Sequence, residues 1–146
     1  MMTAATAEGE VRSLIDSWAG AMRAKDAEAV LGHYSAEVVA FTLAPPLCYV
    51  GLDREALAAW FDTWQDAALG YEMTQLKVMV SQGLALTHSL DWLGGTKVDG
   101  GETGVWFRRT FGLRQIDGRW LIVHEHESVP FYMDGSVRAA VDLRPA

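Results

Sequence analysis

The sequence has a single cysteine, Cys48, among its 146 residues. One thiol excludes an internal disulfide framework and a zinc cluster built from cysteines, and we expect Cys48 to be a buried small apolar side chain. Long apolar runs are also lacking, because none approaches the ~20 residues that a membrane-spanning helix requires. The sequence therefore predicts no membrane partner.

Positive charge is scarce, since 12 lysines and arginines stand against 19 aspartates and glutamates, for a formal charge of −7. A chain of this sign repels phosphate backbones, so nucleic acid is not an expected partner. The first ten residues lack the basic segment and apolar core of a secretory signal, and we expect a cytoplasmic protein. The composition, 50% hydrophobic and 21% charged, predicts one folded domain over residues 1–146, with flexibility at 1–9.

Apolar residues recur at helical spacing in three segments of the first half. The first stripe comprises Val11, Leu14, Ile15, Trp18 and Met22. The other two helices are expected to begin after Asp26 and Asp53, whose side chains suit the N-cap position. The third helix carries the stripe Leu57, Trp60, Phe61 and Trp64.

Residues typical of β-strands dominate most of the remaining chain. The expected strands are 38–43, 71–81, 84–93, 105–115 and 120–128. Asp117-Gly118 joins the last two as a hairpin, and we expect a short helix from Ser136. The chain places its helices first and its antiparallel strands later, and this order indicates the α+β class. We predict a cone of curved antiparallel sheet wrapped by three helices from the N-terminal half, with a small apolar pocket inside.

Alternate residues of a strand point to the same face. On the last expected strand, one face carries two large apolar residues followed by three polar ones. That face holds Trp120, Ile122, His124, His126 and Ser128. Histidine transfers protons near neutral pH, and a neighbouring arginine stabilises a developing oxyanion. The sequence leaves open whether the hairpin loop before this strand has an even or an odd number of residues. An even loop places Arg109 on the face of the histidines, and an odd loop places Arg108 and Thr110 there.

His88 lies on another expected strand, so three of the four histidines fall on strands that can be neighbours. We interpret them as an acid/base pocket walled by Tyr34, Phe41, Trp60 and Trp64. The alternative is that each histidine is a packed core residue. Three histidines can also bind zinc, but a cupin-type site needs a glutamate where Pro130 and Phe131 stand, so we expect no metal.

Four segments carry a family resemblance: YSAEVVAFTLAPPLCYVG at 34–51, THSL at 87–90, WFRRT at 106–110 and IDGRWLIVHEHESVPF at 116–131. With the order of elements, they resemble SnoaL-like proteins of the nuclear-transport-factor-2-like superfamily. That superfamily also holds ketosteroid isomerases, scytalone dehydratase, limonene epoxide hydrolase and polyketide cyclases. The resemblance implies a cone-shaped fold, usually dimeric through the outer sheet face, that works without cofactor or metal.

The resemblance also points to individual polar residues. These are His88, Arg108, Thr110, His124 and Ser128. It thereby favours Arg108 and Thr110, rather than Arg109, beside the histidines. An isomerase-type mechanism is not implied, because Thr42 stands where close relatives are expected to have a carboxylate.

We therefore predict a cofactor-independent acid/base enzyme of the dehydratase, isomerase or cyclase type. Its substrate is a small, mostly apolar or polyketide-like molecule, and its predicted catalytic residues are His88, Arg108 and His124. The residues predicted to bind substrate are Tyr34, Phe41, Trp60, Trp64, Thr110, His126 and Ser128. The alternative is a non-catalytic dimeric module of the same fold, for small-ligand binding or association.

The expected strands have apolar residues on both faces, and helices from one chain cover only one of them. An uncovered apolar face is larger than monomers usually expose, and two-fold dimers are the commonest way to bury it. We therefore expect a homodimer through the convex face, with a pocket inside each protomer. The residues assigned to that face are Val105, Phe107, Phe111, Leu113, Leu121 and Val123.

Overall fold

The computed structural model describes residues 4–146 of the chain. Its helices are α1 (Ala4–Arg23), α2 (Ala27–Leu31) and α3 (Arg54–Phe61). Part of the segment expected to be flexible, residues 1–3, lies outside the described residues, and the rest of it is the start of α1. Asp26 and Asp53 cap α2 and α3 as predicted, accepting hydrogen bonds from the backbone nitrogens of Ala29 and Glu55 at 3.0 and 2.8 Å.

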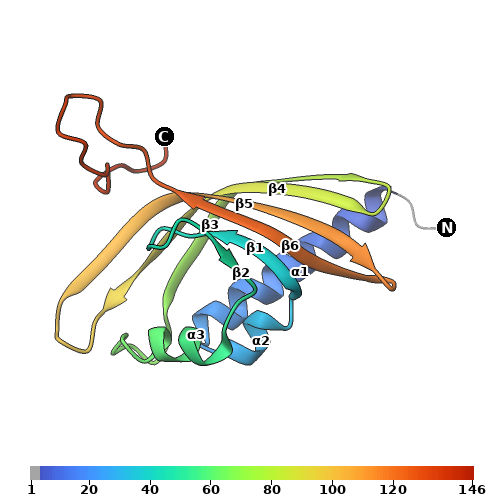
Figure 1. The fold of residues 1–146 in the computed structure, drawn as a ribbon, viewed down its shortest axis with the longest axis horizontal. Helices are drawn as coiled ribbons and strands as arrows, with labels where there is room; N and C mark the ends of the chain where they lie inside the picture. Colours follow the sequence, from blue (N-terminus) through green and yellow to red (C-terminus); the bar gives the residue numbers. More distant parts are fainter. Residues whose placement is uncertain (1–3) are drawn as a thin grey trace.

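Six strands form one curved sheet (Figure 1). They are β1 (Tyr34–Phe41), β2 (Tyr49–Val50), β3 (Gly70–Ser81), β4 (Leu84–Thr96), β5 (Glu102–Ile116) and β6 (Arg119–Ser128). Their order across the sheet is β2-β1-β6-β5-β4-β3. All neighbours are antiparallel except β1 and β6, which run parallel.

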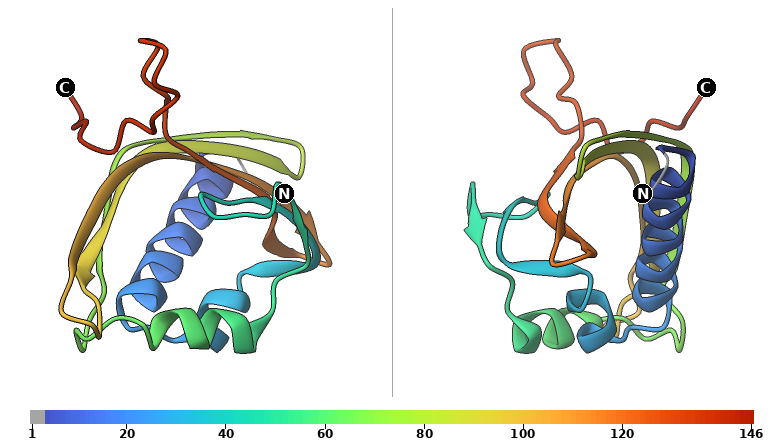
Figure 2. Two further views of the ribbon diagram at one scale, coloured as in Figure 1. Left: turned by 60° about the vertical axis from the view of Figure 1, so that its left-hand side comes forward. Right: turned by 90° about the vertical axis from the view of Figure 1, so that its right-hand side faces the viewer.

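The sheet bends around α1 and stays unclosed, with α2 and α3 at one end of the curve (Figure 2). We call the side that faces α1 the inner face and the other side the outer face. Trp18 of α1 packs edge-on against Tyr71 and Phe111, with ring centres 5.3 and 5.1 Å apart. The predicted α+β class and curved antiparallel sheet with three helices are confirmed.

Four local predictions differ from the structure. Cys48 is exposed rather than buried, because it lies in the irregular segment between β1 and β2. The short strand β2 was not predicted, and β1 begins four residues earlier than the expected strand 38–43. The tail has no helix after Ser136, because the chain instead turns back on itself and Phe131 forms an isolated β-bridge with Ala139. Among the described residues, no helix has the length and apolar character needed to cross a bilayer.

One extra residue in β6 changes which of its side chains face inward. Asp117 and Gly118 have φ angles of 50° and 80° and form the predicted two-residue hairpin turn. From that turn Leu113 pairs with Ile122, but Gly112 pairs with His124, so Val123 is a β-bulge. Beyond the bulge the alternation of faces is inverted, and Glu125 is buried where period two predicts an outward side chain.

A row of glycines crosses the outer face where Trp92 of β4 lies. Gly94 pairs with both Gly70 and Gly104, and the Trp92 ring covers all three positions. A Cβ at Gly94 would lie 2.3 Å from that ring and 2.7 Å from the Thr103 carbonyl oxygen. The indole therefore occupies space that side chains on this row would need, as aromatic residues do over strand glycines elsewhere.

Replacing Gly94 by alanine should lower the free energy of unfolding by about 1–3 kcal/mol, since the added methyl group meets the backbone as well as the ring. Urea unfolding followed by tryptophan fluorescence measures the change. Gly20→Ala in α1 is the matched control, because nothing lies within 4 Å of its Cβ position. The control should gain up to about 1 kcal/mol from helix propensity. An unchanged midpoint in Gly94→Ala would contradict this packing.

Candidate active site

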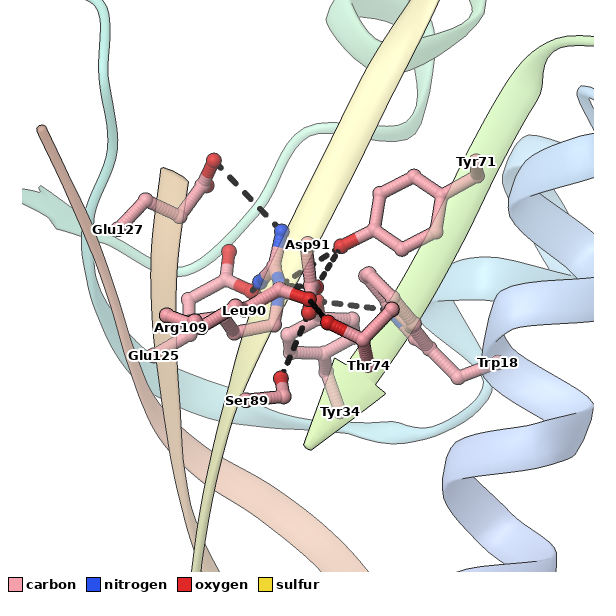
Figure 3. A network of polar contacts seen from close by, with 10 residues as sticks. All are labelled: Trp18, Tyr34, Tyr71, Thr74, Ser89, Leu90, Asp91, Arg109, Glu125 and Glu127. Atoms are coloured by element: carbon pink, nitrogen blue, oxygen red, sulfur yellow. Dashed lines mark hydrogen bonds and ion pairs between the residues drawn. The ribbon is translucent and has the colours of Figure 1, made fainter. Parts of the chain in front are cut away.

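The inner face of the sheet carries one arginine and three carboxyl side chains. Arg109 comes from β5, Asp91 from β4, and Glu125 and Glu127 from β6. The strands are neighbours, and the register pairs Arg109 with Glu127 directly. Because alternate residues of a strand share one face, these side chains converge on the side of α1 (Figure 3). We call these four residues, with Tyr34 and Tyr71, the arginine cluster.

Arg109 is the centre of the arginine cluster and is 4% exposed. Its Nε lies 3.1 Å from Asp91 Oδ2 and its Nη1 lies 2.9 Å from Glu125 Oε2. The guanidinium also lies 4.6 Å from the centre of the Trp18 ring, within range of a cation–π interaction. Burial by itself lowers the pKa of Arg109, but the negative groups around it raise that pKa overall, so the guanidinium stays charged.

Hydroxyl groups hold two of the carboxylates in place. Asp91 accepts hydrogen bonds from the Tyr71 hydroxyl and, at 2.7 Å, from Ser89 Oγ. Glu125 accepts one from the Tyr34 hydroxyl at 2.7 Å, and Trp18 Nε1 donates to that hydroxyl at 3.0 Å. Burial raises the pKa of both tyrosines well above the ordinary value, so both remain protonated donors.

Glu127 is the most exposed and least tightly held of the three carboxyls. Its Oε2 is 3.6 Å from Arg109 Nη2, and its side chain is 14% exposed, against 0% for Asp91. Burial raises the pKa of Glu127, Arg109 lowers it, and the nearby carboxylates of Glu125 and Asp91 raise it again, to about 7. A carboxyl group with this pKa both takes and gives a proton near neutral pH.

Charge explains why the proton resides on Glu127. With every group ionised, one guanidinium would face three carboxylates in a buried region, and such an excess of negative charge is costly. Asp91 and Glu125 are stabilised by hydroxyl donors and by the shorter contacts to Arg109. Among residues 4–146 no hydroxyl group donates to Glu127, and its contact with Arg109 is longer, at 3.6 Å. Protonation of Glu127 therefore relieves the repulsion at the least cost.

Partly exposed apolar side chains surround the hydrophobic core of which α1 and the inner face are parts. Several pack against the core yet remain partly exposed, namely Leu52, Leu57, Trp60, Leu93, Val105 and Val129. A cleft of about 510 Å³ lies between α2, β1 and the start of α3, and Tyr34 lines it. Tyr34 therefore connects the cleft with Glu125.

The predicted histidine site lies on the outer face, not inside the curve. The residues that the structure places there are Phe41, His88, Arg108, Thr110, His124, His126 and Ser128. For the residues of β6 the bulge at Val123 is the physical reason, because it puts His124 on the face opposite to Ile122. His88 and Arg108 face outward because their neighbours Ser89 and Arg109 are the buried, inward residues of β4 and β5. The expectation that these residues line a pocket within the curve is therefore corrected.

The register nevertheless brings these outer residues together. Thr110 pairs with His88 on one side and with His126 on the other, and Arg108 pairs with Ser128. Arg108, rather than Arg109, thus shares a face with the histidines. A hairpin loop of even length would by itself place Arg109 there, but the bulge at Val123 shifts the alternation of β6 by one residue. Arg108 Nε donates to Ser128 Oγ at 3.0 Å, and His124 Nδ1 lies 2.7 Å from the Val39 carbonyl oxygen.

The predicted aromatic wall is divided between three places. Tyr34 belongs to the arginine cluster, and Phe41 packs edge-on against His124 and His126 on the outer face. Trp60 lies in α3 and Trp64 follows it, with Lys97 Nζ 3.7 Å from the centre of the Trp64 ring. Among residues 4–146 no three histidine, cysteine, aspartate or glutamate side chains converge suitably for a metal ion.

Sequence reasoning missed most of the arginine cluster. Alternation places Asp91, Glu125 and Glu127 on the faces opposite the histidines, and because the histidines were expected inside the curve, none of the three was named as a site residue. One sequence signal marks the cluster, because Arg109 stands between Phe107 and Phe111 at period two and these rings are buried in the structure. Phe107, Phe111 and Leu113, predicted for the dimer face, are likewise core residues of the inner face.

Comparison with known proteins supports this architecture. The family model of the SnoaL-like domain matches residues 11–132. The chain belongs to the SnoaL-like domain family. Among curated proteins, none matches it.

Solved structures agree on the fold of this SnoaL-like protein. An NTF2-like protein of unknown function from Pseudomonas putida KT2440 has 32% identity and a TM-score of 0.81, covering 99% of this chain and 100% of its own. A ketosteroid isomerase-like protein from Erwinia carotovora atroseptica has 21% identity and a TM-score of 0.65, with coverage of 83% and 94%. The association domain of C. elegans CaMKII has 15% identity and a TM-score of 0.66, with coverage of 86% and 97%.

The raised pKa of Glu127 predicts a specific dependence of stability on pH. The folded state keeps the Glu127 proton up to about pH 7, whereas the unfolded chain releases it near the ordinary value of 4.5. Stability is therefore lost as the pH rises from about 4.5 to 7, by up to about 3 kcal/mol from this group. Glu127→Gln should remove that loss and exceed the wild type in stability at pH 8, with little difference at pH 4.

Urea unfolding of both proteins across this pH range measures the difference. Glu72→Gln, an exposed carboxyl on β3, is the control and should follow the wild type at every pH. A constant difference between Glu127→Gln and the wild type from pH 4 to pH 8 would contradict the assignment.

Proposed function

We propose that this SnoaL-like protein is a cofactor-independent acid/base enzyme acting on a small, mostly apolar molecule bound within the curved sheet. The observation that carries the proposal is Glu127, an inward carboxyl with a pKa of about 7 beside a fixed guanidinium. The proton carrier is thus Glu127 rather than the outer histidines. The reaction class is dehydration, isomerisation or cyclisation, each of which moves protons without an external oxidant or reductant.

Ionised Glu127 acts as the base that takes a proton from a carbon atom next to a carbonyl group. The same carboxyl then returns that proton to another atom in isomerisation or cyclisation, or to a departing hydroxyl in dehydration. Arg109 keeps the carboxylate oriented through its Nη2, and its other nitrogens remain bound to Asp91 and Glu125. The partly exposed apolar side chains near the cluster supply the contact surface for the substrate.

A generic proton-transfer probe tests this role without knowledge of the natural substrate. 5-Nitrobenzisoxazole is small and apolar, and a base that removes its C–H proton opens its N–O bond to a coloured cyanophenolate. We expect saturable turnover that rises with pH through about 7 as Glu127 ionises. Glu127→Gln should lose roughly 10²–10⁴ of the rate, and Glu72→Gln should retain it. Equal rates in the wild type and Glu127→Gln would refute the assignment.

The second candidate is a non-catalytic dimeric module for ligand binding or association. It is favoured by the complete internal bonding of Asp91 and Glu125 and by the structural hydrogen bonds of Arg108 and His124. The likeness in fold to the CaMKII association domain is in keeping with it. Absence of turnover together with the Glu127 stability effect described above would select this candidate. In either case we propose a homodimer, and the cytoplasmic location stays a prediction.

A further inference from the structure

A second cleft lies on the outer face of the sheet, on the side away from α1. Its volume is about 380 Å³, and residues of three neighbouring strands, β3, β4 and β5, line it. A volume of this size lies in the range of small-molecule sites. The lining residues with outer-face side chains are Gln75, Lys77, His88, Leu90, Arg108 and Thr110. The acid/base function proposed above uses none of these side chains.

The sheet register brings the polar side chains of this cleft together. Lys77 pairs with His88, and His88 pairs with Thr110, so these three residues form a row across β3, β4 and β5. Directly paired residues point to the same face with Cβ atoms about 4.5–5.5 Å apart. Arg108 pairs with Leu90 in the next row and is thus a diagonal neighbour of His88. An ammonium, an imidazole, a guanidinium and a hydroxyl group therefore share one small area of the outer face.

A bulge in β3 forms one edge of the cleft. The register of β3 against β4 shifts between Thr74 and Lys77, so Gln75 and Leu76 stand opposite the single residue Ser89. Gln75 has a φ angle of 56°, in the left-handed region that residues other than glycine rarely adopt. Its side chain is exposed and lines the cleft. The bulge therefore supplies an amide group that regular strand pairing would not place there.

The positive charges of the cleft have no counter-ion. Within residues 4–146, Lys77 and Arg108 form no ion pair, and no aspartate or glutamate lines the cleft. Arg108 uses only its Nε, which donates to Ser128 Oγ at 3.0 Å. The whole chain has a formal charge of −7, so this local excess of positive charge is contrary to the overall balance. Clefts lined by charge of one sign concentrate ligands of the opposite sign.

The donor groups match an anion that has several acceptor oxygens. The guanidinium of Arg108 donates two parallel hydrogen bonds from its terminal nitrogens, and Lys77 adds a compact charge. The Thr110 hydroxyl and the Gln75 amide are neutral donors. A phosphate monoester has nearly two negative charges near neutral pH and three acceptor oxygens. A carboxylate has one charge and two oxygens and would leave part of this donor set unused.

The cleft also has an apolar side. Leu90 is a partly exposed residue of its lining, and the carbon chains of Lys77 and Arg108 lie beside it. A bare phosphate ion is much smaller than 380 Å³. An organic group attached to the phosphate therefore has both room and apolar contacts in the same cleft.

We propose that the outer cleft binds a small organic phosphate monoester. Arg108 and Lys77 neutralise the phosphate, while Thr110 and Gln75 donate hydrogen bonds to its oxygens. The organic group lies against Leu90. The site is separate from the acid/base function, because it occupies the face of the sheet opposite to Glu127.

Isothermal titration calorimetry of the full chain with phenyl phosphate at low ionic strength tests the site. We expect saturable binding of phenyl phosphate, weaker binding of inorganic phosphate and no measurable binding of phenol, since the phosphate provides the charge and the ring provides the apolar contact. Arg108→Gln should raise the dissociation constant at least about tenfold. Arg108→Lys should raise it less but still measurably, because lysine keeps the charge and lacks the planar fork.

Arg114→Gln is the matched control. Arg114 is an exposed arginine on the same face of β5, six residues beyond Arg108 and thus roughly 20 Å from it. Because solvent and salt screen charges at that distance, this variant should leave the dissociation constant within about twofold of the wild type. Absence of saturable binding, or equal weakening by Arg108→Gln and Arg114→Gln, overturns the proposal. Inorganic phosphate that binds as tightly as phenyl phosphate overturns the assignment of an organic ligand.

Discussion

The extra residue at Val123 determines which chemistry lies inside the curved sheet. Without this bulge, strict alternation from Trp120 would turn His124 and His126 inward. With it, Glu125 and Glu127 face α1, where Arg109 stands on the neighbouring strand. Bulges are common next to functional sites because they redirect side chains without disturbing the rest of the ladder. The inner cluster and the outer histidine row are two consequences of one inserted residue.

The arginine cluster combines a structural and a chemical function in the same group of side chains. Arg109 is surrounded by aromatic rings and is tied to carboxylates of two strands, β4 and β6. Truncating a buried ion pair on one side costs several kcal/mol, since the other charge remains buried and uncompensated. The fold therefore depends on the short contacts of Asp91 and Glu125 with Arg109. Glu127 makes the longer contact and is the carboxyl with the raised pKa, so the residues that stabilise the site differ from the one that exchanges a proton.

Much of the fold was predictable from the sequence because local signals and tertiary structure agree. Asp26 and Asp53 cap helices where their side chains suit the N-cap, and Asp117-Gly118 turns where both residues take positive φ. The faces of β6 were not predictable, since no residue type marks Val123 as a bulge. That single shift put His124, His126 and Ser128 on the outer face and turned Glu125 and Glu127 inward. The aromatic wall failed differently. Trp60 and Trp64 do pack together, with ring centres 5.9 Å apart, but no short-range pattern fixes where they lie relative to Phe41 of β1.

The alternation of β5 links the two faces of the sheet at adjacent residues. Arg108 points outward to Ser128, and Arg109 points inward to the carboxylates. The peptide unit between them is shared, so a change in the twist of β5 at this point alters both surroundings together. Because the charge near Glu127 sets its pKa, the position of this stretch of β5 bears both on the inner contact of Arg109 with Glu127 and on the outer contact of Arg108 with Ser128.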